Sequence, residues 1–234
     1  MNSILFEEAE VTDSQLILND HRFKHIKSVL RSEVGNKVKT GQINGHMGTS
    51  TLLSIDDSSA TLQIDDLHQP PPPASNISLL LALPRPKVVR RVLRSATELG
   101  IKHITLVNAW RVEKSYWQSP VLSAENIRKT LIEGLSQAVD TRLPTVELET
   151  LFKPFVEDRL PTLAQGKRLI LPHPYTDQTI TPTHRPTILA IGPEGGFIPY
   201  EVEQLQKQGF EVVKLGSNIL RVETAMSYAV GRLG

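Results

Sequence analysis

The stretch TILAIGPEGGFIPYEVEQLQKQGFEVVKLGSNILRVETA, residues 187–225, decides the fold that we predict for this chain. Its first five residues, 187–191, form an apolar run that is typical of a buried strand. The run ends at GPEGG, residues 192–196, where three glycines let the backbone turn sharply and leave it uncovered by side chains. We expect a helix to begin near Pro199 and to stop at Gly209, because proline suits a first helical turn and glycine suits a helix end.

A second strand and a second loop complete this stretch. Residues 210–215 predict another buried strand, residues 216–218 form its loop, and residues 219–221 lead into a last helix. Ligands of open α/β sheets bind at the carboxyl ends of strands. The two glycine-bearing loops therefore predict a ligand site made largely of bare backbone, and ordinary tight turns are the alternative. The glycines match neither a G-x-G-x-x-G dinucleotide motif nor a phosphate-binding P-loop.

Composition excludes several classes of site. The chain has 234 residues and a formal net charge of +1, so a nucleic-acid partner has to be sought in local charge. Because it has no cysteine, disulfides, thiolate nucleophiles and cysteine-ligated metals are excluded. No apolar run approaches the roughly 20 residues of a membrane span, and the first residues lack the features of a signal peptide. We therefore expect a cytoplasmic protein without a membrane segment.

The first part of the chain is predicted to form a small β barrel. Short strand-like segments recur there at intervals of about 8–12 residues, which is typical of barrels and sandwiches. Asp20 suits the N-cap of a helix whose apolar face contains Phe23, Ile26, Val29 and Leu30. The predicted strands are residues 3–11, 15–18, 37–43, 51–55 and 60–64.

Four consecutive prolines, residues 70–73, mark the clearest boundary in the chain, because such a run favours a stiff extended segment. After it, apolar runs alternate with amphipathic segments, and this alternation favours a mainly parallel α/β sheet. The predicted strands are residues 77–83, 104–107 and 169–171, and the predicted helices are residues 87–99 and 123–139.

Four motifs resemble those of one known family. ALP at residues 82–84 and ATELG at residues 96–100 are followed by GPEGGF at residues 192–197 and LGSNILRVETA at residues 215–225. This set resembles the RsmE family of ribosomal RNA uracil-N3 methyltransferases, which belongs to the knotted SPOUT superfamily. The resemblance extends over nearly the whole chain and is strongest around these motifs.

The resemblance implies the domain organisation. It implies a PUA-like RNA-binding β barrel at residues 1–68, a proline-rich linker at residues 69–76, and a SPOUT methyltransferase domain at residues 77–234. The α/β sheet of that domain would be mainly parallel and would end in a C-terminal trefoil knot. True knots are nearly absent from proteins, so the knot rests wholly on the resemblance. A homodimer is implied in the same way.

The resemblance also implies S-adenosylmethionine as the cofactor, held mostly by backbone groups of three loops. Two interpretations of Glu194 stay open: its carboxylate faces the sulfonium, or it braces the loop. His173 lies between two prolines without a second ligand at metal spacing, so no metal site is predicted. The implied cofactor residues are Leu171, His173, Gly192, Pro193, Glu194, Gly195, Gly196, Leu215, Gly216, Ile219, Leu220 and Thr224.

The implied reaction needs two further groups. Uracil N3 carries a proton at neutral pH, so negative charge develops on the uracil carbonyls as the methyl group is transferred. Arg221 is the candidate that stabilises this charge. For Glu223 three interpretations stay open: a catalytic base, an anchor for Arg221, or a salt bridge that holds the loop closed.

Two clusters of cations without interspersed acids, within residues 21–31 and 85–94, predict contact with RNA, and solvated helix faces are the alternative. The resemblance implies that this RNA is 16S ribosomal RNA in the small subunit. Arg111 matches an arginine of the family. Trp110, Tyr116 and Trp117 either stack on bases or pack in a core or dimer. Asp140 departs from the family, which often has an arginine there. The predicted RNA-binding residues are Arg22, Lys24, Lys27, Arg31, Arg85, Lys87, Arg90, Arg91, Arg94 and Arg111.

Two other functions compete with this prediction. One is a knotted methyltransferase acting on another RNA position, such as a ribose 2′-hydroxyl, which the N-terminal barrel and the GPEGGF spelling disfavour. The other is a non-catalytic RNA-binding or ribosome-assembly factor, which the intact glycines, Arg221 and Glu223 disfavour.

Overall fold

The computed structural model of the chain describes residues 2–234 and divides into two compact units. Unit 1 comprises the described residues up to Pro73 together with Ile132–Leu143, and unit 2 comprises Ala74–Leu131 with Pro144–Gly234. Each unit has a six-stranded sheet of its own. None of the helices within residues 2–234 is both long and apolar enough to cross a membrane.

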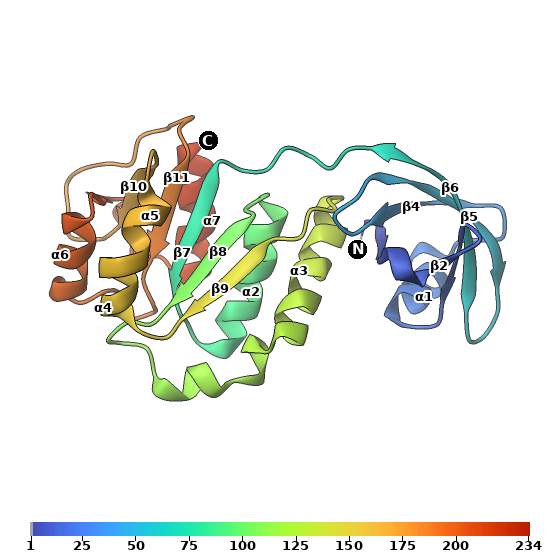
Figure 1. The fold of residues 1–234 in the computed structure, drawn as a ribbon, viewed down its shortest axis with the longest axis horizontal. Coiled ribbons are helices and arrows are strands. Elements are labelled where there is room, and N and C mark those ends of the chain that lie inside the picture. Colours follow the sequence, from blue (N-terminus) through green and yellow to red (C-terminus); the bar gives the residue numbers. More distant parts are fainter. Residues whose placement is uncertain (1) are drawn as a thin grey trace. The chain divides into compact units, whose positions relative to one another are not determined.

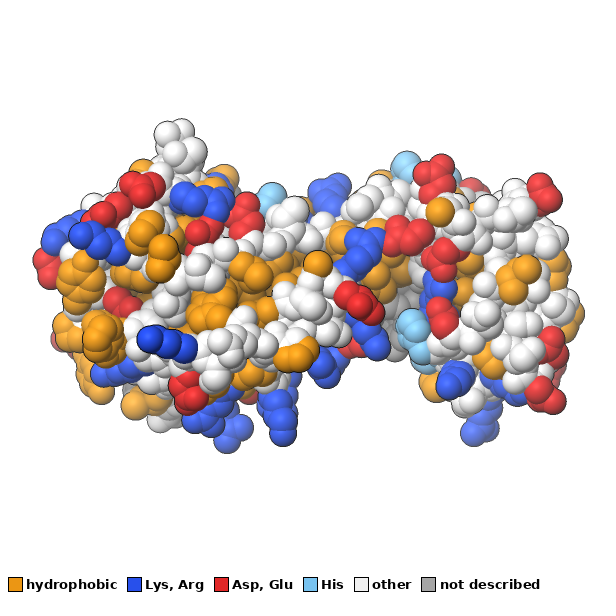
Figure 2. Space-filling view, turned by 60° about the horizontal axis from the view of Figure 1, so that its bottom comes forward, with side chains coloured by type: hydrophobic (Ala, Val, Ile, Leu, Met, Phe, Trp, Pro, Cys, Tyr) orange, Lys and Arg blue, Asp and Glu red, His pale blue; other side chains and the backbone are white. Residues whose placement is uncertain are grey.

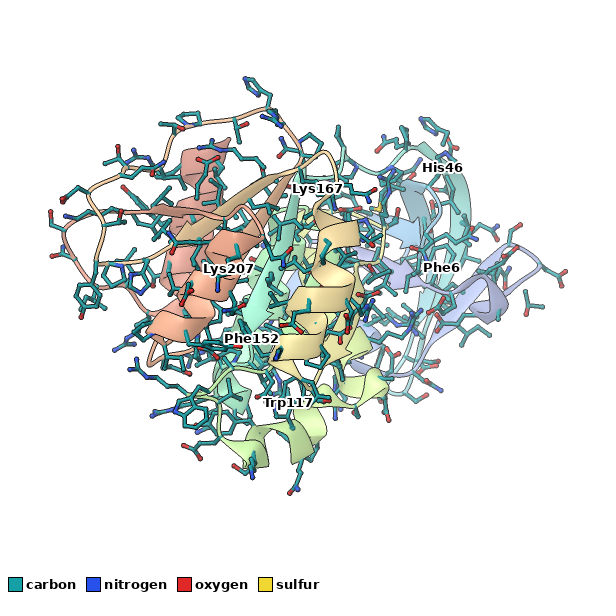
Figure 3. All side chains as sticks on the ribbon, turned by 60° about the vertical axis from the view of Figure 1, so that its left-hand side comes forward. Phe6, His46, Trp117, Phe152, Lys167 and Lys207 are labelled. Atoms are coloured by element: carbon teal, nitrogen blue, oxygen red, sulfur yellow. The ribbon has the colours of Figure 1, made fainter. Side chains whose placement is uncertain are left out.

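The sheet of unit 1 is almost wholly antiparallel. Its order is β1-β4-β5-β6-β3-β2, and only β1 and β4 run parallel. Figure 1 shows the long strands strongly curled. Alternating apolar residues such as Leu16, Leu18 and Leu62 form its core with Phe6, which is labelled in Figure 3. The strands are β1 (Ile4–Phe6), β2 (Val11–Thr12), β3 (Gln15–Leu18), β4 (Lys37–Gln42), β5 (Met47–Ile55) and β6 (Ala60–Gln69).

The segment Ile132–Leu143 belongs to this unit through specific contacts. The carbonyl of Ser136 accepts backbone N–H groups from Asn2 at 2.9 Å and Ser3 at 3.1 Å. Leu135, which is fully buried, packs in one cluster with Leu5 and Met47. A stretch more than 60 residues beyond the barrel-like sequence therefore completes its core.

The helix after Asp20 differs from the prediction. Asp20 caps α1 (His21–His25) as expected, accepting the N–H of Arg22 at 2.8 Å, and Phe23 and Ile26 are buried. Val29 and Leu30 are exposed, so their predicted place on the apolar face is wrong. The reason is that the helix widens into a π-helical turn (Ile26–Leu30), which changes the spacing of side chains around the axis.

The sheet of unit 2 is entirely parallel, which confirms the predicted mainly parallel α/β fold. Its order is β12-β10-β11-β7-β8-β9 (Figure 1). The chain proceeds outward from β7 through β8 to β9, and then returns to build β10, β11 and β12 on the other side of β7. The strands are β7 (Ile77–Ala82), β8 (His103–Val107), β9 (Thr145–Glu149), β10 (Arg168–Pro172), β11 (Thr187–Ile191) and β12 (Glu211–Val213).

The helices of unit 2 include one segment that the sequence did not predict. Residues 152–164 contain two prolines, yet they continue from α4 through a π-helical turn into α5, with Phe155 and Val156 buried. Strand β9 was also missed, because its side chains are mostly exposed. The α-helices are α2 (Pro86–Glu98), α3 (Ala124–Ala138), α4 (Phe152–Pro154), α5 (Leu160–Ala164), α6 (Pro199–Lys207) and α7 (Val222–Leu233); α3 enters unit 1 at Ile132.

The remaining predicted boundaries need small corrections. The predicted strand over residues 3–11 is interrupted by a 3₁₀ turn (Glu8–Glu10), and residues 210–215 supply only the three residues of β12. Strand β12 pairs with β10 and lies two places from β11. The loops that follow β10, β11 and β12 therefore meet at one edge of the sheet, beside the point where its order reverses, which is where such sheets bind ligands.

Candidate functional site

A cavity of about 710 Å³ lies at the carboxyl edge of the unit 2 sheet. Segments after β7, β8, β10, β11 and β12 line it, so the topology gathers five loops around one space. Leu171 and Thr224 are outside the lining, because Leu171 is fully buried within β10 and Thr224 is exposed in the first turn of α7. The predicted cofactor residues in the lining are His173, Gly192, Pro193, Glu194, Gly195, Gly196, Leu215, Gly216, Ile219 and Leu220.

The glycines of the loop after β11 have distinct physical reasons. Gly196 has φ of 70°, a left-handed conformation that side chains disfavour, and its N–H closes a turn onto the carbonyl of Pro193 at 2.7 Å. A Cβ on Gly195 would lie 2.8 Å from Cδ of Arg111. A Cβ on Gly216, in the other loop, would meet no described atom within 4 Å, so its backbone faces open space at the cavity.

Two neighbouring loops are fastened to the glycine loop. The carboxylate of Glu194 accepts the backbone N–H of Arg85, after β7, at 3.0 Å. The guanidinium of Arg111, after β8, donates to the carbonyl of Gly195. Of the two interpretations of Glu194, the structure therefore contains the bracing hydrogen bond.

Glu201 is a site residue that sequence reasoning missed. Its side chain is 3% exposed, and its carboxylate accepts two backbone N–H groups, from Trp110 at 2.7 Å and from Ile198 at 2.9 Å. It thus joins the loop after β8 to the start of α6. A glutamate three residues after the N-cap is one half of a capping box and could have indicated the second bond, although the N-cap itself, Ile198, has no side-chain acceptor.

The two catalytic candidates, Arg221 and Glu223, both line the cavity, but Glu223 does not anchor Arg221. Arg221 is the exposed N-cap residue of α7, and within residues 2–234 its guanidinium has neither a hydrogen bond nor an ion pair. Glu223 is paired instead with Arg91 of α2, with Nη1 and Oε1 3.6 Å apart. Arg91, rather than Arg221, is thus the cation that holds Glu223.

His173 lies in the lining beside Tyr175. Its ring meets that of Tyr175 edge-on at 5.5 Å between centroids, and Nδ1 accepts the Tyr175 N–H at 3.3 Å. Partial burial lowers the pKa of His173, so the imidazole is neutral at pH 7. The described part of the chain contains no group of three His, Cys, Asp or Glu residues that could hold a metal ion.

The second predicted cationic cluster lies at or near the cavity. Arg85 and Arg91 of this cluster line it, as does Arg111, which was predicted separately, while Lys87 and Arg90 project from α2. Arg94 is half-buried and has a partner of its own. Figure 2 shows Lys and Arg side chains standing out along the lower edge of unit 2, at the left of the view.

The first predicted cluster, in unit 1, is only partly available to a ligand. The side chain of Arg22 is 14% exposed and is bonded to Glu10 at 2.5 Å and to Asp20 at 2.8 Å. Lys27 pairs with Asp57 at 2.8 Å, whereas Lys24 and Arg31 are exposed. These acids lie outside residues 21–31, so the charge of that segment alone could not show that two of its cations are paired.

The aromatic candidates separate in the structure. Trp110 is 80% exposed, which excludes core packing for its ring. Trp117, labelled in Figure 3, donates its indole N–H to Asn108 at 3.0 Å, and the Tyr116 hydroxyl donates to Glu113 at 3.0 Å. Asp140, in unit 1, is buried and accepts the N–H of Arg142 at 2.9 Å, which holds a turn.

Known proteins are similar to this chain in sequence. Residues 70–234 match the family model of the RNA methyltransferase domain. Ribosomal RNA small subunit methyltransferase E of Treponema pallidum is 32% identical over 96% of this chain and 87% of its own length. The protein of the same name from Rickettsia conorii is 24% identical over 100% and 93%.

Two solved structures have the same fold. A methyltransferase from Legionella pneumophila, in complex with S-adenosylmethionine, has a TM-score of 0.75 and 23% identity over 98% of this chain and 95% of its own. Ribosomal RNA small subunit methyltransferase E from Neisseria gonorrhoeae, bound to S-adenosylmethionine, has a TM-score of 0.75 and 20% identity over 97% and 95%.

Proposed function

Because this chain belongs to the family of ribosomal RNA small subunit methyltransferase E, we propose that it methylates N3 of a uridine in 16S ribosomal RNA, using S-adenosylmethionine. The observation that carries this proposal is the cavity at the carboxyl edge of the sheet, where bare backbone loops meet a paired glutamate and an arginine that has no partner among residues 2–234. These are the parts that the reaction requires: a cofactor cradle, a stabiliser of negative charge and a proton acceptor.

The residues around the cavity fit the cofactor. Its volume, about 710 Å³, lies within the range of small-molecule sites. Backbone groups of residues 192–196 and 215–220 would hold the adenosine, and Ile219 and Leu220 add apolar surface. The carboxylates of Glu194 and Glu223 suit a cation. When bound, S-adenosylmethionine supplies a transferable methyl group on a positively charged sulfonium.

We assign Arg221 to the uracil carbonyls. Its guanidinium is exposed at the cavity and has no partner within residues 2–234, so no existing ion pair has to break before it binds an anion. Donors directed at developing charge contribute most when they are already in place. Holding N3 in line with the methyl group supplies the rest of the rate enhancement.

Glu223 is our candidate for the acceptor of the N3 proton. Arg91 fixes its carboxylate at the cavity, since the two side chains are 3.6 Å apart and both belong to the lining. The salt-bridge interpretation is the competing one, and it predicts similar, small losses of turnover when either Glu223 or Arg91 is substituted.

We further propose the finer architecture that the family implies. The connection over residues 173–186 supports a knot, because it bonds to Lys214 after β12 (Lys214 N–H to the Gln178 carbonyl, 2.6 Å) and to the last helix (Thr183 N–H to the Leu233 carbonyl, 2.8 Å). The chain from β12 to α7 would pass beneath it. The curled sheet of unit 1 supports a PUA-like barrel, and a homodimer follows from the resemblance alone.

A methyl-transfer assay tests the proposed function. Small ribosomal subunits that lack the modification are incubated with labelled S-adenosylmethionine, and the RNA is digested to nucleosides. We expect the label in 3-methyluridine. Label in another nucleoside would refute the N3 assignment but retain a methyltransferase, and absence of both label and cofactor binding would refute the enzyme.

A further inference from the structure

Trp110 combines an exposed indole with a fixed backbone. Its side chain is 80% exposed, while Ala109 before it and Val112 after it are buried. Its backbone N–H donates to the buried carboxylate of Glu201 at 2.7 Å. The Val112 N–H closes a turn onto the Ala109 carbonyl at 3.0 Å. The chain therefore presents a large aromatic side chain to solvent from a position that cannot easily shift.

This position is at the margin of the cavity. Arg111, the next residue, lines the cavity and donates to Gly195. Adjacent Cα atoms are 3.8 Å apart, so the Trp110 backbone is directly next to a residue that lines the cavity. Tyr200, next to Glu201, is a second exposed aromatic in this region.

We propose that the Trp110 indole is a stacking surface for an unpaired base of the RNA next to the target nucleotide. An enzyme that modifies a base must take it out of the stack, which leaves the neighbouring bases without a stacking partner. Aromatic side chains replace that partner for single-stranded RNA. This inference rests on the proposed function, which supplies the RNA.

The charges around Trp110 favour RNA over an apolar protein surface. Arg111 and Lys114, which follow Trp110 closely in sequence, are exposed, and so are Glu113 and, in the lining of the cavity, Arg85. An apolar partner seated on the indole would bury three cations against one carboxylate, and burial of the unpaired charge is costly. Phosphates would pair with the three cations while a base covers the ring.

Fluorescence can test this directly, because the chain has only two tryptophans. Trp117→Phe leaves Trp110 as the single reporter, and its melting temperature checks that the fold is kept. A uridine-rich single-stranded RNA of roughly 12 nucleotides is titrated without cofactor. We expect saturable quenching of Trp110, and little quenching by the same sequence in a duplex, where the bases are already stacked.

Substitution gives the second readout. Stacking on one base contributes about 1–3 kcal/mol, so Trp110→Ala should weaken RNA binding about 5- to 150-fold, and Trp110→Phe should recover most of the affinity. Unchanged affinity in Trp110→Ala, or absent quenching, would overturn the proposal. Emission that is already shielded from acrylamide in the free protein, and exposed on dilution, would assign the surface to a second copy of the chain and also overturn it.

The outcome is separable from the proposed function. RNA titrations need no methyl transfer, so a failure to methylate small subunits would leave the stacking result standing. Conversely, quenching could be absent in a protein that still forms 3-methyluridine. Calorimetry of S-adenosylmethionine binding to Trp110→Ala monitors the cavity in both cases.

Discussion

Arg221 is the residue whose removal should separate chemistry from cofactor binding. Its guanidinium lies at the cavity without a partner among residues 2–234, so Arg221→Ala breaks no contact that holds a loop. We expect turnover to fall about 10²- to 10³-fold, as for other lost donors to developing charge, while the Kd for S-adenosylmethionine changes little. Lys207→Ala is the matched control, because Lys207 (Figure 3) is an exposed cation of α6 outside the lining. Unchanged turnover would remove Arg221 from the mechanism.

Glu223 and Arg91 form a pair that distinguishes a base from a salt bridge. If Glu223 accepts the N3 proton, Glu223→Gln should lower turnover about 10²- to 10⁴-fold, whereas Arg91→Met should cost much less because the carboxylate remains. If the pair only closes the loop, the two substitutions should have similar and small effects. Single-turnover rates of both variants at saturating cofactor decide between these outcomes.

Gly195 and Arg111 should be energetically coupled. A Cβ on Gly195 would lie 2.8 Å from Cδ of Arg111, so Gly195→Ala displaces that side chain. We expect cofactor affinity to fall about fivefold in the wild-type background and to change little in an Arg111→Ala background, a coupling within the usual range for residues in contact. Gly231→Ala is the control, because a Cβ there would meet none of the described residues within 4 Å. A loss that persists without Arg111 would mean that Gly195 itself touches the cofactor.

At the scale of elements, the spacing of apolar residues correctly predicted those strands and helices that bury a regular apolar face. Strand β11 and helix α2 lie where their apolar spacing indicated. Segments 145–149 and 152–164 were missed, because one is largely exposed and the other contains prolines that a π-helical turn accommodates. The bare loops of the cavity were also predicted, since glycine content is visible in sequence.

The hydrogen bonds and ion pairs that join one loop to another could not be predicted in the same way. Glu201 meets the N–H of Trp110 across 91 positions of the chain. Arg91 meets Glu223 across an even longer separation. Which carboxylate reaches which donor depends on strand order, and strand order is decided by the packing of the whole sheet.

Strand β12 shows how one such ion pair, between Arg168 and Glu211, positions the site. It has three residues at the sheet edge and carries the loop of Leu215 and Gly216. Arg168 of β10 grips Glu211 with two hydrogen bonds, at 3.0 and 2.7 Å, and bonds Thr181 as well. These bonds lower the pKa of Glu211, although partial burial opposes the shift.

The pair should make the stability of β12 depend on pH. A lowered folded pKa means that the carboxylate stabilises the fold above its unfolded pKa of about 4.3 and loses this contribution as pH falls through the folded value. Arg168→Met should therefore cost about 1 kcal/mol more at pH 7 than at pH 2, allowing for the partial exposure of Glu211. The bonds to Thr181 are lost at both pH values and add a cost that does not depend on pH. Urea unfolding at both pH values measures the difference. Faster amide exchange in β12 of the variant should accompany it, and a cost independent of pH would contradict this account.

At the scale of the whole molecule, unit 1 is not continuous in sequence. The predicted domain boundaries remain a prediction, but the unit found here includes Ile132–Leu143. Thr141 accepts the N–H of Asn44 at 2.8 Å through its carbonyl and donates its hydroxyl to Gly45 at 2.6 Å. No compositional change marks this segment, so only the folded chain reveals where it belongs.

Residues 1–73 alone should consequently fail to fold cooperatively. Without Leu135 the apolar cluster of Leu5 and Met47 is open, and the N–H groups of Asn2 and Ser3 lose the Ser136 carbonyl. Loss of one buried leucine costs about 2–5 kcal/mol, which is comparable to the whole stability of a small domain. Appending residues 132–143 to Pro73 through a flexible linker should restore a sigmoidal urea transition, and Leu135→Ala within the appended segment should weaken it again. A cooperative transition of equal midpoint for residues 1–73 alone would show that the segment only decorates a unit that is already complete.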